Sequence, residues 1–364
     1  MKIREIISSI ESFAPLAFQE DYDNAGLITG DQEQEATGAL ITVDVTEVII
    51  EEALKKNTNL IIAHHPIIFE GLKKITGKNY VERIIIKAIK NNIAIYAAHT
   101  NLDNIQGGVN SKIAEKLDLQ NTNILVPLKN QLMKLVYFVP VGHAEQTRKA
   151  VFDAGAGHIG NYDMCSYNLE GKGSFRAGEG TNPFVGNKNE IHYENETRVE
   201  TIFPRHLKNK ILSALFKAHP YEEAAYDLYP ITNEFEKAGS GIIGELEKEL
   251  PALDFLKKVK TTFNAQSIKH TKLLKKPVKK IAVCGGSGSF LLNDAIKQNA
   301  DVFISADFKY HQFFDAEDKI IIADIGHFES EQVTKELFYE LLIKKFPKFA
   351  VYLTEVNSNP INYL

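Results

Sequence analysis

Two adjacent histidines, His64 and His65, end the apolar segment NLIIAHHP and are well placed to do chemistry. The run before them predicts a buried strand, and successive strand side chains point to opposite faces of a sheet. Both imidazoles can therefore reach one place only if the backbone bends, and Pro66 favours such a bend. Taken alone, the pair could also be two ordinary histidines at a strand end.

Two other segments show the same pattern of polar side chains after an apolar strand. AAHTNLDN supplies His99 and Asp103, and DIGHFESEQ supplies His327 and Glu331. His327 and Glu331 are four residues apart, so on a helix they share one face. The alternative for this segment is that Ser330 and Glu331 only cap and charge the start of a helix.

Imidazole and carboxylate together indicate a transition-metal site, because calcium and magnesium prefer oxygen ligands throughout. The five candidate ligands are His64, His65, Asp103, His327 and Glu331. They exceed what one tetrahedral zinc ion needs. A two-metal site with ions about 3.5 to 4 Å apart and Glu331 as a bridge accommodates them all. We therefore expect two divalent ions per chain, zinc or iron first, with manganese or nickel as alternatives.

These candidates lie in two α/β regions at the ends of the chain. The first region has predicted helices at 3–14, from 46, at 79–91 and at 108–117, and strands at 38–45, 59–63 and 93–98. The last has predicted strands at 280–285, 301–306 and 319–325, and helices at 290–299 and 329–345. Such alternation indicates βαβ units and a mostly parallel sheet, which binds ligands beyond its strand ends. We expect two similar lobes that form one metal-binding domain from residues 1–127 and 241–364.

The central segment, residues 128–240, follows another plan. Its predicted order is β-α-β-β-β-α-β, in which 165–171 and 171–178 are separate strands. This order approximates the ferredoxin-like split βαβ fold with one extra strand. We expect an inserted α+β domain that folds on its own.

Several motifs resemble those of the NGG-interacting-factor-like family, also called GTP cyclohydrolase 1 type 2 homologues. The motifs are DYDNAGLITGD, AHHPIIF, HTNLDNIQGGVN, SADFKYHQFFDA and GHFES followed by Glu331. The resemblance covers both outer thirds in order and implies a dinuclear metal site at His64, His65, Asp103, His327 and Glu331. It also implies a toroidal homohexamer. The central segment is similar to the PII-like, CutA-like insertion of longer members, and Tyr22 departs from the family, which often has tryptophan there.

We expect a hydrolase in which two metal ions lower the pKa of a bridging water, giving hydroxide that attacks carbon or phosphorus. The family name implies ring opening of GTP at C8 of guanine, or related nucleotide or phosphoester hydrolysis. His99 and His311 are candidate proton donors. The alternative is a non-catalytic metal-handling or regulatory protein whose inserted domain senses a small effector.

Composition excludes other classes of partner. The 42 basic and 47 acidic residues give a net charge of −5 without a basic stripe, so we expect no duplex nucleic acid. No apolar run of about 18 residues could span a membrane. The N-terminal segment has helical spacing unlike a signal peptide, and Cys165 and Cys284 lie far apart, so we expect a cytoplasmic protein. The remaining partners are a small-molecule substrate or effector, a nucleotide among them, and further copies of the chain.

Three other segments have open interpretations. CGGSGSF, residues 284–290, could cradle a phosphate with backbone amides, but it lacks the lysine of a P-loop. Asp307 and His311 could line the crevice behind the ligands, or could belong to an ordinary helix start. The turn at Asp23 could position a ligand loop, or could be only a turn.

Overall fold

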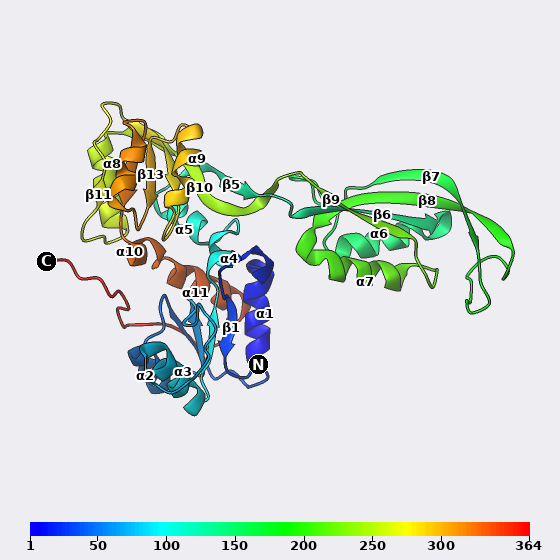
Figure 1. The fold of residues 1–364 in the computed structure, drawn as a ribbon, viewed down its shortest axis with the longest axis horizontal. Coiled ribbons are helices and arrows are strands. Elements are labelled where there is room, and N and C mark those ends of the chain that lie inside the picture. The colour runs from blue at the N-terminus through cyan, green and yellow to red at the C-terminus, as the bar shows by residue number, and fades with distance from the viewer. The chain divides into compact units, whose positions relative to one another are not determined.

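The computed structural model describes all 364 residues. They form two compact units: unit 1 is Met1–Pro127 with Glu236–Leu364, and unit 2 is Leu128–Phe235 (Figure 1). The second boundary lies at 236 rather than at 241, because strand β10 (Phe235–Leu250) has already begun there. No helix is both long and apolar enough to cross a bilayer.

The first sheet of unit 1 has the strand order β1-β4-β3-β2-β15. Its strands are β1 (Gly26–Thr29), β2 (Ala39–Thr42), β3 (Leu60–Ala63), β4 (Ala94–Ala97) and β15 (Val351–Leu353). All run parallel except β1, which is antiparallel to β4. Successive side chains of β3 face opposite layers: Ile62 joins the core with α1 (Ile3–Phe13), and Ile61 joins the core with α2 (Glu47–Lys55) and α3 (Tyr80–Lys90). Burial on both faces explains why the parallel strands are apolar throughout.

The second sheet of unit 1 has the order β11-β14-β13-β12-β10-β5. Besides β10, its strands are β5 (Gln120–Leu128), β11 (Lys269–His270), β12 (Val278–Val283), β13 (Val302–Ser305) and β14 (Ile321–Asp324). Strands β12, β13 and β14 are parallel, while β10 and β11 run antiparallel to their neighbours β12 and β14. The remaining helices of this half include α8 (Ala252–Thr262) and α9 (Leu292–Lys297).

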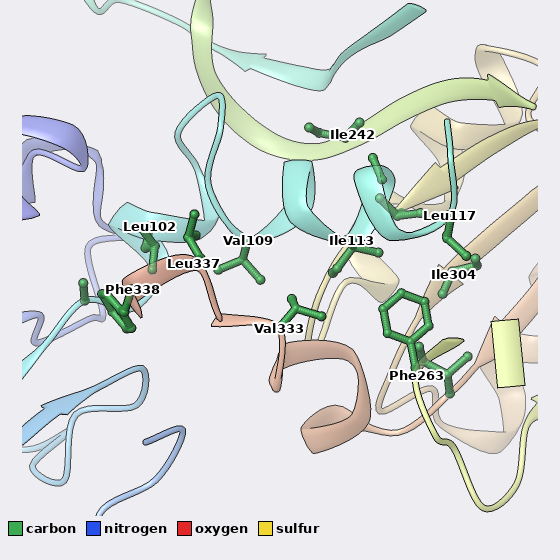
Figure 2. Close-up of a cluster of buried hydrophobic side chains, with 14 of the residues drawn as sticks. Leu102, Val109, Ile113, Leu117, Ile242, Phe263, Ile304, Val333, Leu337 and Phe338 are labelled. Carbon is green, nitrogen blue, oxygen red and sulfur yellow. The ribbon is translucent and has the colours of Figure 1, made fainter. Parts of the chain in front are cut away.

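One hydrophobic core joins the two sheets. It contains Ile62 of β3 and Ile304 of β13 together with side chains from α5 (Val109–Lys116). Figure 2 shows Val109 and Ile113 of α5 near Val333 and Leu337 within this core. The two sheets of unit 1 therefore hold each other in place.

The predicted single helix at 329–345 is wrong. Two helices occupy this region, α10 (His327–Glu331) and α11 (Thr334–Lys345). Gly326 starts α10 with a φ of 96°, a conformation that glycine adopts easily. Between the helices, Val333 is buried in the shared core, so packing rather than helical periodicity decides where the chain turns.

Unit 2 consists of β6 (Leu132–Pro140), α6 (Ala144–Asp153), β7 (Tyr167–Arg176), β8 (Ile191–Pro204), α7 (Lys208–Ala218) and β9 (Tyr226–Ile231). Its sheet order is β7-β8-β6-β9, and all neighbours are antiparallel. The predicted extra strand is wrong, because β7 pairs with β8 without interruption from Tyr167↔Glu200 to Arg176↔Ile191. Gly171 and Gly173 are therefore part of one strand, not a turn between two.

Candidate metal centre

Six candidate side chains meet in unit 1 beyond the ends of three parallel strands. His64 and His65 follow β3, and His99 follows β4. Asp103 ends the short helix α4 (Thr100–Asp103), and α10, which follows β14, carries His327 and Glu331. Since the carboxyl ends of parallel strands share one edge of a sheet, the two lobes present these side chains to a common place.

The first donor set consists of His64, Asp103 and Glu331. His64 Nε2 lies 3.7 Å from Asp103 Oδ1 and 3.7 Å from Glu331 Oε1. The His64 side chain is fully buried and that of Glu331 is nearly so. These atoms are too far apart for direct hydrogen bonds, yet they enclose one point from three sides.

The second donor set consists of His65, His327 and Glu331. Glu331 Oε2 lies 2.9 Å from His65 Nε2 and 3.0 Å from His327 Nε2, and the two Nε2 atoms are 3.3 Å apart. Glu331 thus belongs to both sets, and each set receives a different oxygen of its carboxylate.

The other ring nitrogen of each donor histidine has an oxygen acceptor. Nδ1 of His64 lies 3.0 Å from Ala98 O, Nδ1 of His65 lies 2.7 Å from Asp44 Oδ1, and Nδ1 of His327 lies 2.6 Å from Asp307 Oδ2. Each acceptor requires the proton on Nδ1, which leaves the lone pair on Nε2 facing the centre. This is the arrangement that orients metal-binding histidines in proteins.

A cation would satisfy atoms that the protein leaves without partners. His64 Nε2, Asp103 Oδ1 and Glu331 Oε2 are buried and have no hydrogen-bond partner. Asp44 selects the tautomer of His65 with the proton on Nδ1, so Nε2 presents a lone pair to Glu331 Oε2 at 2.9 Å. Two acceptor atoms then face each other, and they form a hydrogen bond only when Nε2 gains a proton. Each unsatisfied buried group costs about 1–3 kcal/mol. The donor chemistry therefore fits divalent transition-metal ions.

The pKa values of the cluster reflect burial and the negative charge of its carboxylates. Burial, and then the negative charge of Glu331, raise the pKa of Asp103 well above its ordinary value. Burial lowers the pKa of His64 to about 4. Burial also opposes the charged form of His65, but hydrogen bonds with Asp44 and Glu331 outweigh it and raise the pKa of His65 to about 10. The negative charges of Asp44 and Glu331 thus favour a cationic group at His65.

His99 completes the cluster from the end of β4. Its ring centroid lies 5.2 Å from those of both His64 and His65. Asp23 Oδ1 accepts a hydrogen bond from His99 Nδ1 at 2.8 Å, while the amide of Thr100 donates to Asp23 Oδ2 at 3.0 Å. Burial opposes ionisation of Asp23, but the hydrogen bonds from His99 and Thr100 outweigh it and lower its pKa to about 2. The predicted turn at Asp23 thus fixes the orientation of His99.

His311 lies elsewhere and does not line the cavity at the centre. It is exposed, in the 3-10 helix Tyr310–Ala316, where its ring contacts those of Tyr310 and Phe314. The expectation that Asp307 and His311 together line the crevice assumed an α-helix, but Asp307 has a φ of 57° and precedes the 3-10 helix. Only Asp307 reaches the site, through His327.

The glycine-rich segment 284–290 forms a wall of the site. Its amides donate from Gly285 to Asn110 Oδ1 at 2.8 Å, from Gly286 to Ser330 Oγ at 2.9 Å and from Gly288 to Ser305 Oγ at 2.9 Å. These amides are committed within the protein, so they do not form the phosphate cradle considered from the sequence. Gly286 has a φ of 60°, and a Cβ there would lie 2.1 Å from Glu331 Oε1. The glycine makes room for the shared carboxylate.

Sequence reasoning missed Asp44 and the role of Gly286. Asp44 lies within the segment ITVDV just after β2, and only the pairing of β2 with β3 in the sheet brings it to His65. The glycine doublet at 285–286 was a signal of close backbone approach.

The cavity at the centre has a volume of about 400 Å³, and exposed aromatic rings of Tyr22, Phe69 and Phe290 line it with the donors.

Comparison with known proteins gives a consistent match over the whole chain. Residues 1–360 match the family model described as Duf34/NIF3 (NGG1p interacting factor 3). Proteins named GTP cyclohydrolase 1 type 2 homolog are 40% identical over 364 residues in Halalkalibacterium halodurans and 38% identical over 367 residues in Bacillus subtilis, each covering 99% of this chain and 98% of the relative. A solved Bacillus cereus structure, described as related to NIF3, is 40% identical with a TM-score of 0.88 and covers 100% of this chain and 99% of its own.

Proposed function

The chain belongs to the Duf34/NIF3 family, and from this membership and the donor geometry we propose that it is a hydrolase dependent on two divalent metal ions. The observation that carries the proposal is the position of Glu331, whose two oxygens face two separate donor sets. Three imidazoles and two carboxylates suit zinc or iron best. His64 and Asp103 would hold one ion, His65 and His327 the other, and Glu331 both.

Ions held here would lower the pKa of a bound water and polarise the group that it attacks. The protein's own residues orient the site and exclude water from its deepest part. Asp44 and Asp307 hold the imidazoles of His65 and His327 through Nδ1. We assign proton transfer to His99, because Asp23 fixes its Nδ1 proton while the ring lines the cavity.

We propose a nucleotide or related phosphoester as the substrate, with ring opening of the GTP cyclohydrolase type as the specific case. The names of the relatives support this class. The exposed rings of Tyr22, Phe69 and Phe290 at the cavity offer faces on which a planar base could stack.

We further propose that unit 2 is an inserted ferredoxin-like domain of the PII-like type and that the chain assembles as a homohexamer. The β-α-β-β-α-β order of unit 2 supports the first proposal. The second rests on family resemblance, and sedimentation equilibrium tests it: a hexamer of the 40.8 kDa chain has a mass of about 245 kDa. A monomeric mass would contradict it.

The deciding experiment compares the wild-type protein with Glu331→Gln and with Glu336→Gln as a matched control. Glu336 is an exposed glutamate whose ion pair with Lys116 contributes little. Metal analysis should find about two ions per chain in the wild type and the control and fewer than one in Glu331→Gln. Nucleotides, phosphoesters and cyclic amides are then assayed on all three proteins.

Fewer than one ion per chain in the wild type would refute the dinuclear site. Turnover by metal-free protein would refute the mechanism. If the ions exchange readily and no substrate is turned over, the protein handles metal without catalysis.

A further inference from the structure

Unit 2 contains a second cavity, with a volume of about 410 Å³. Its walls include the rings of Phe138, Phe175, Phe184 and Tyr221. The ring centroid of Tyr221 lies 5.9 Å from that of Phe175 and 6.2 Å from that of Phe184. The volume is within the range of small-molecule sites, which are typically apolar with a few convergent polar groups.

The carboxylates that line this cavity, those of Glu196, Glu222 and Glu223, form no ion pairs, and Glu196 is the one on β8. Glu194, Glu196 and Glu200 lie on one face of β8, because side chains alternate along a strand. Glu194 pairs with His192 at 2.9 Å and Glu200 pairs with Lys134 at 3.0 Å, whereas Glu196 is half-buried, lines the cavity and has no ion pair. No ion pair therefore offsets its charge.

The surroundings of Glu196 hold its carboxylate in this position. Gly173 of β7 lies beside it, and a Cβ there would be 2.2 Å from Glu196 Oε2. The Tyr221 hydroxyl faces the carboxylate, and burial together with the charge of Glu196 raises the pKa of Tyr221.

The backbone amide of Asn182 donates to Glu222 Oε1 at 2.9 Å, which joins the loop after β7 to the loop before β9.

We propose that this cavity binds a small organic cation, an amine or guanidinium on a short apolar or planar body. Aromatic faces attract cations, and Glu196 supplies the opposite charge in a partly desolvated place. Glu222 and Glu223 also line the cavity, where Arg176 is the one basic residue, so its formal charge is negative. That charge disfavours phosphates and carboxylates, and all residues that line the cavity belong to unit 2.

Binding is tested on the full-length protein by isothermal titration calorimetry. The probes are phenethylamine and agmatine, with 2-phenylethanol as a neutral control of similar shape and phenylacetate as an anionic control. Both cations should bind at least about tenfold more tightly than either control, a difference of about 1.4 kcal/mol. Equal binding of 2-phenylethanol, or no binding of either cation at millimolar concentration, would overturn the proposal.

Variants then locate the site. Glu196→Gln should weaken phenethylamine binding at least about tenfold. Glu194→Gln, on the same strand, should leave it unchanged. In Gly173→Ala the new methyl group displaces the carboxylate of Glu196, so binding should also weaken while thermal unfolding stays close to that of the wild type.

If Glu196→Gln unfolds, Phe184→Ala provides the test, because Phe184 is 53% exposed and its removal leaves little of the core changed. Undiminished binding in folded Glu196→Gln, or in Phe184→Ala, would refute the assignment.

Discussion

Asp44 offers a selective way to weaken one of the two donor sets. Its Oδ1 accepts the Nδ1 proton of His65 at 2.7 Å, and its Oδ2 accepts a hydrogen bond from Ser358 at 3.0 Å. The substitution Asp44→Asn keeps the shape: its amide oxygen accepts from His65 Nδ1, and its NH2 group donates to Ser358 Oγ in place of accepting from it. It removes the charge that makes the imidazole of His65 a stronger donor. His64 and Asp103 have no contact with Asp44, so the first donor set keeps its own environment.

The expected loss of affinity is about 10- to 100-fold for one ion, the usual effect of changing a group behind a metal ligand. This corresponds to about 1.4–2.7 kcal/mol. Zinc titration in competition with a chromophoric chelator measures it. In Asp44→Asn the titration should separate into one ion held as in the wild type and one released at lower chelator concentration.

The matched control is Asp254→Asn, an exposed aspartate of α8 that pairs with Lys257 at 3.6 Å. It should titrate as the wild type does. Equal weakening of both ions in Asp44→Asn, or weakening of neither, would refute the assignment of His65 to a separate second set.

Three further substitutions test other parts of the site. Gly286→Ala places a methyl group 2.1 Å from the position of Glu331 Oε1, so metal analysis should find both ions reduced; full metal content would show that Glu331 does not need that space. His311→Ala changes an exposed residue outside the cavity, so metal content and turnover should match the wild type, and a loss of turnover would restore its catalytic role. Asp23 has a folded pKa of about 2, below its ordinary value, so its contribution to stability is complete above about pH 3.8 and is lost as the pH falls through 2. Urea unfolding of metal-free protein should therefore show the wild type more stable than Asp23→Asn at pH 5, with a gap that narrows toward pH 3; a constant gap would contradict the role of the charge.

Local pattern predicted the strands that precede the donors. The parallel strands β3, β4 and β14 are short apolar runs bounded by polar residues, and this signal needs no knowledge of distant contacts. The sequence did not predict strand β10, because its residues FEKAGSGIIGELEKEL are rich in glycine and charge and form no apolar run. Gly239 lies against the backbone of β5, where a Cβ would be 2.2 Å from Val126 O, so the strand depends on neighbours that are distant in sequence.

Within the site, too, residues recognised by local spacing were predicted, and residues that act through contacts distant in sequence were not. His327 and Glu331 were found through helical spacing, which is local. Asp44 and Gly286 act only because the sheet and the wall segment bring them to His65 and Glu331, and a single sequence does not encode such contacts in any periodicity. The proton-donor role of His311 stays a prediction, because the structure shows only that this residue is exposed in a 3-10 helix and does not line the cavity.

The metal centre depends on the folding of unit 1 as a whole. Its donors come from two distant segments, 64–103 and 327–331, and the shared core that includes Ile62 and Ile304 holds the two sheets in place. That core must offset the cost of burying lone pairs without partners, about 1–3 kcal/mol for each group. Bound ions would remove this cost and add their own binding free energy to the stability of the folded state. Because Glu331 serves both donor sets, each proposed ion would satisfy one of its buried oxygens, so binding at either set would stabilise the packing of the two sheets.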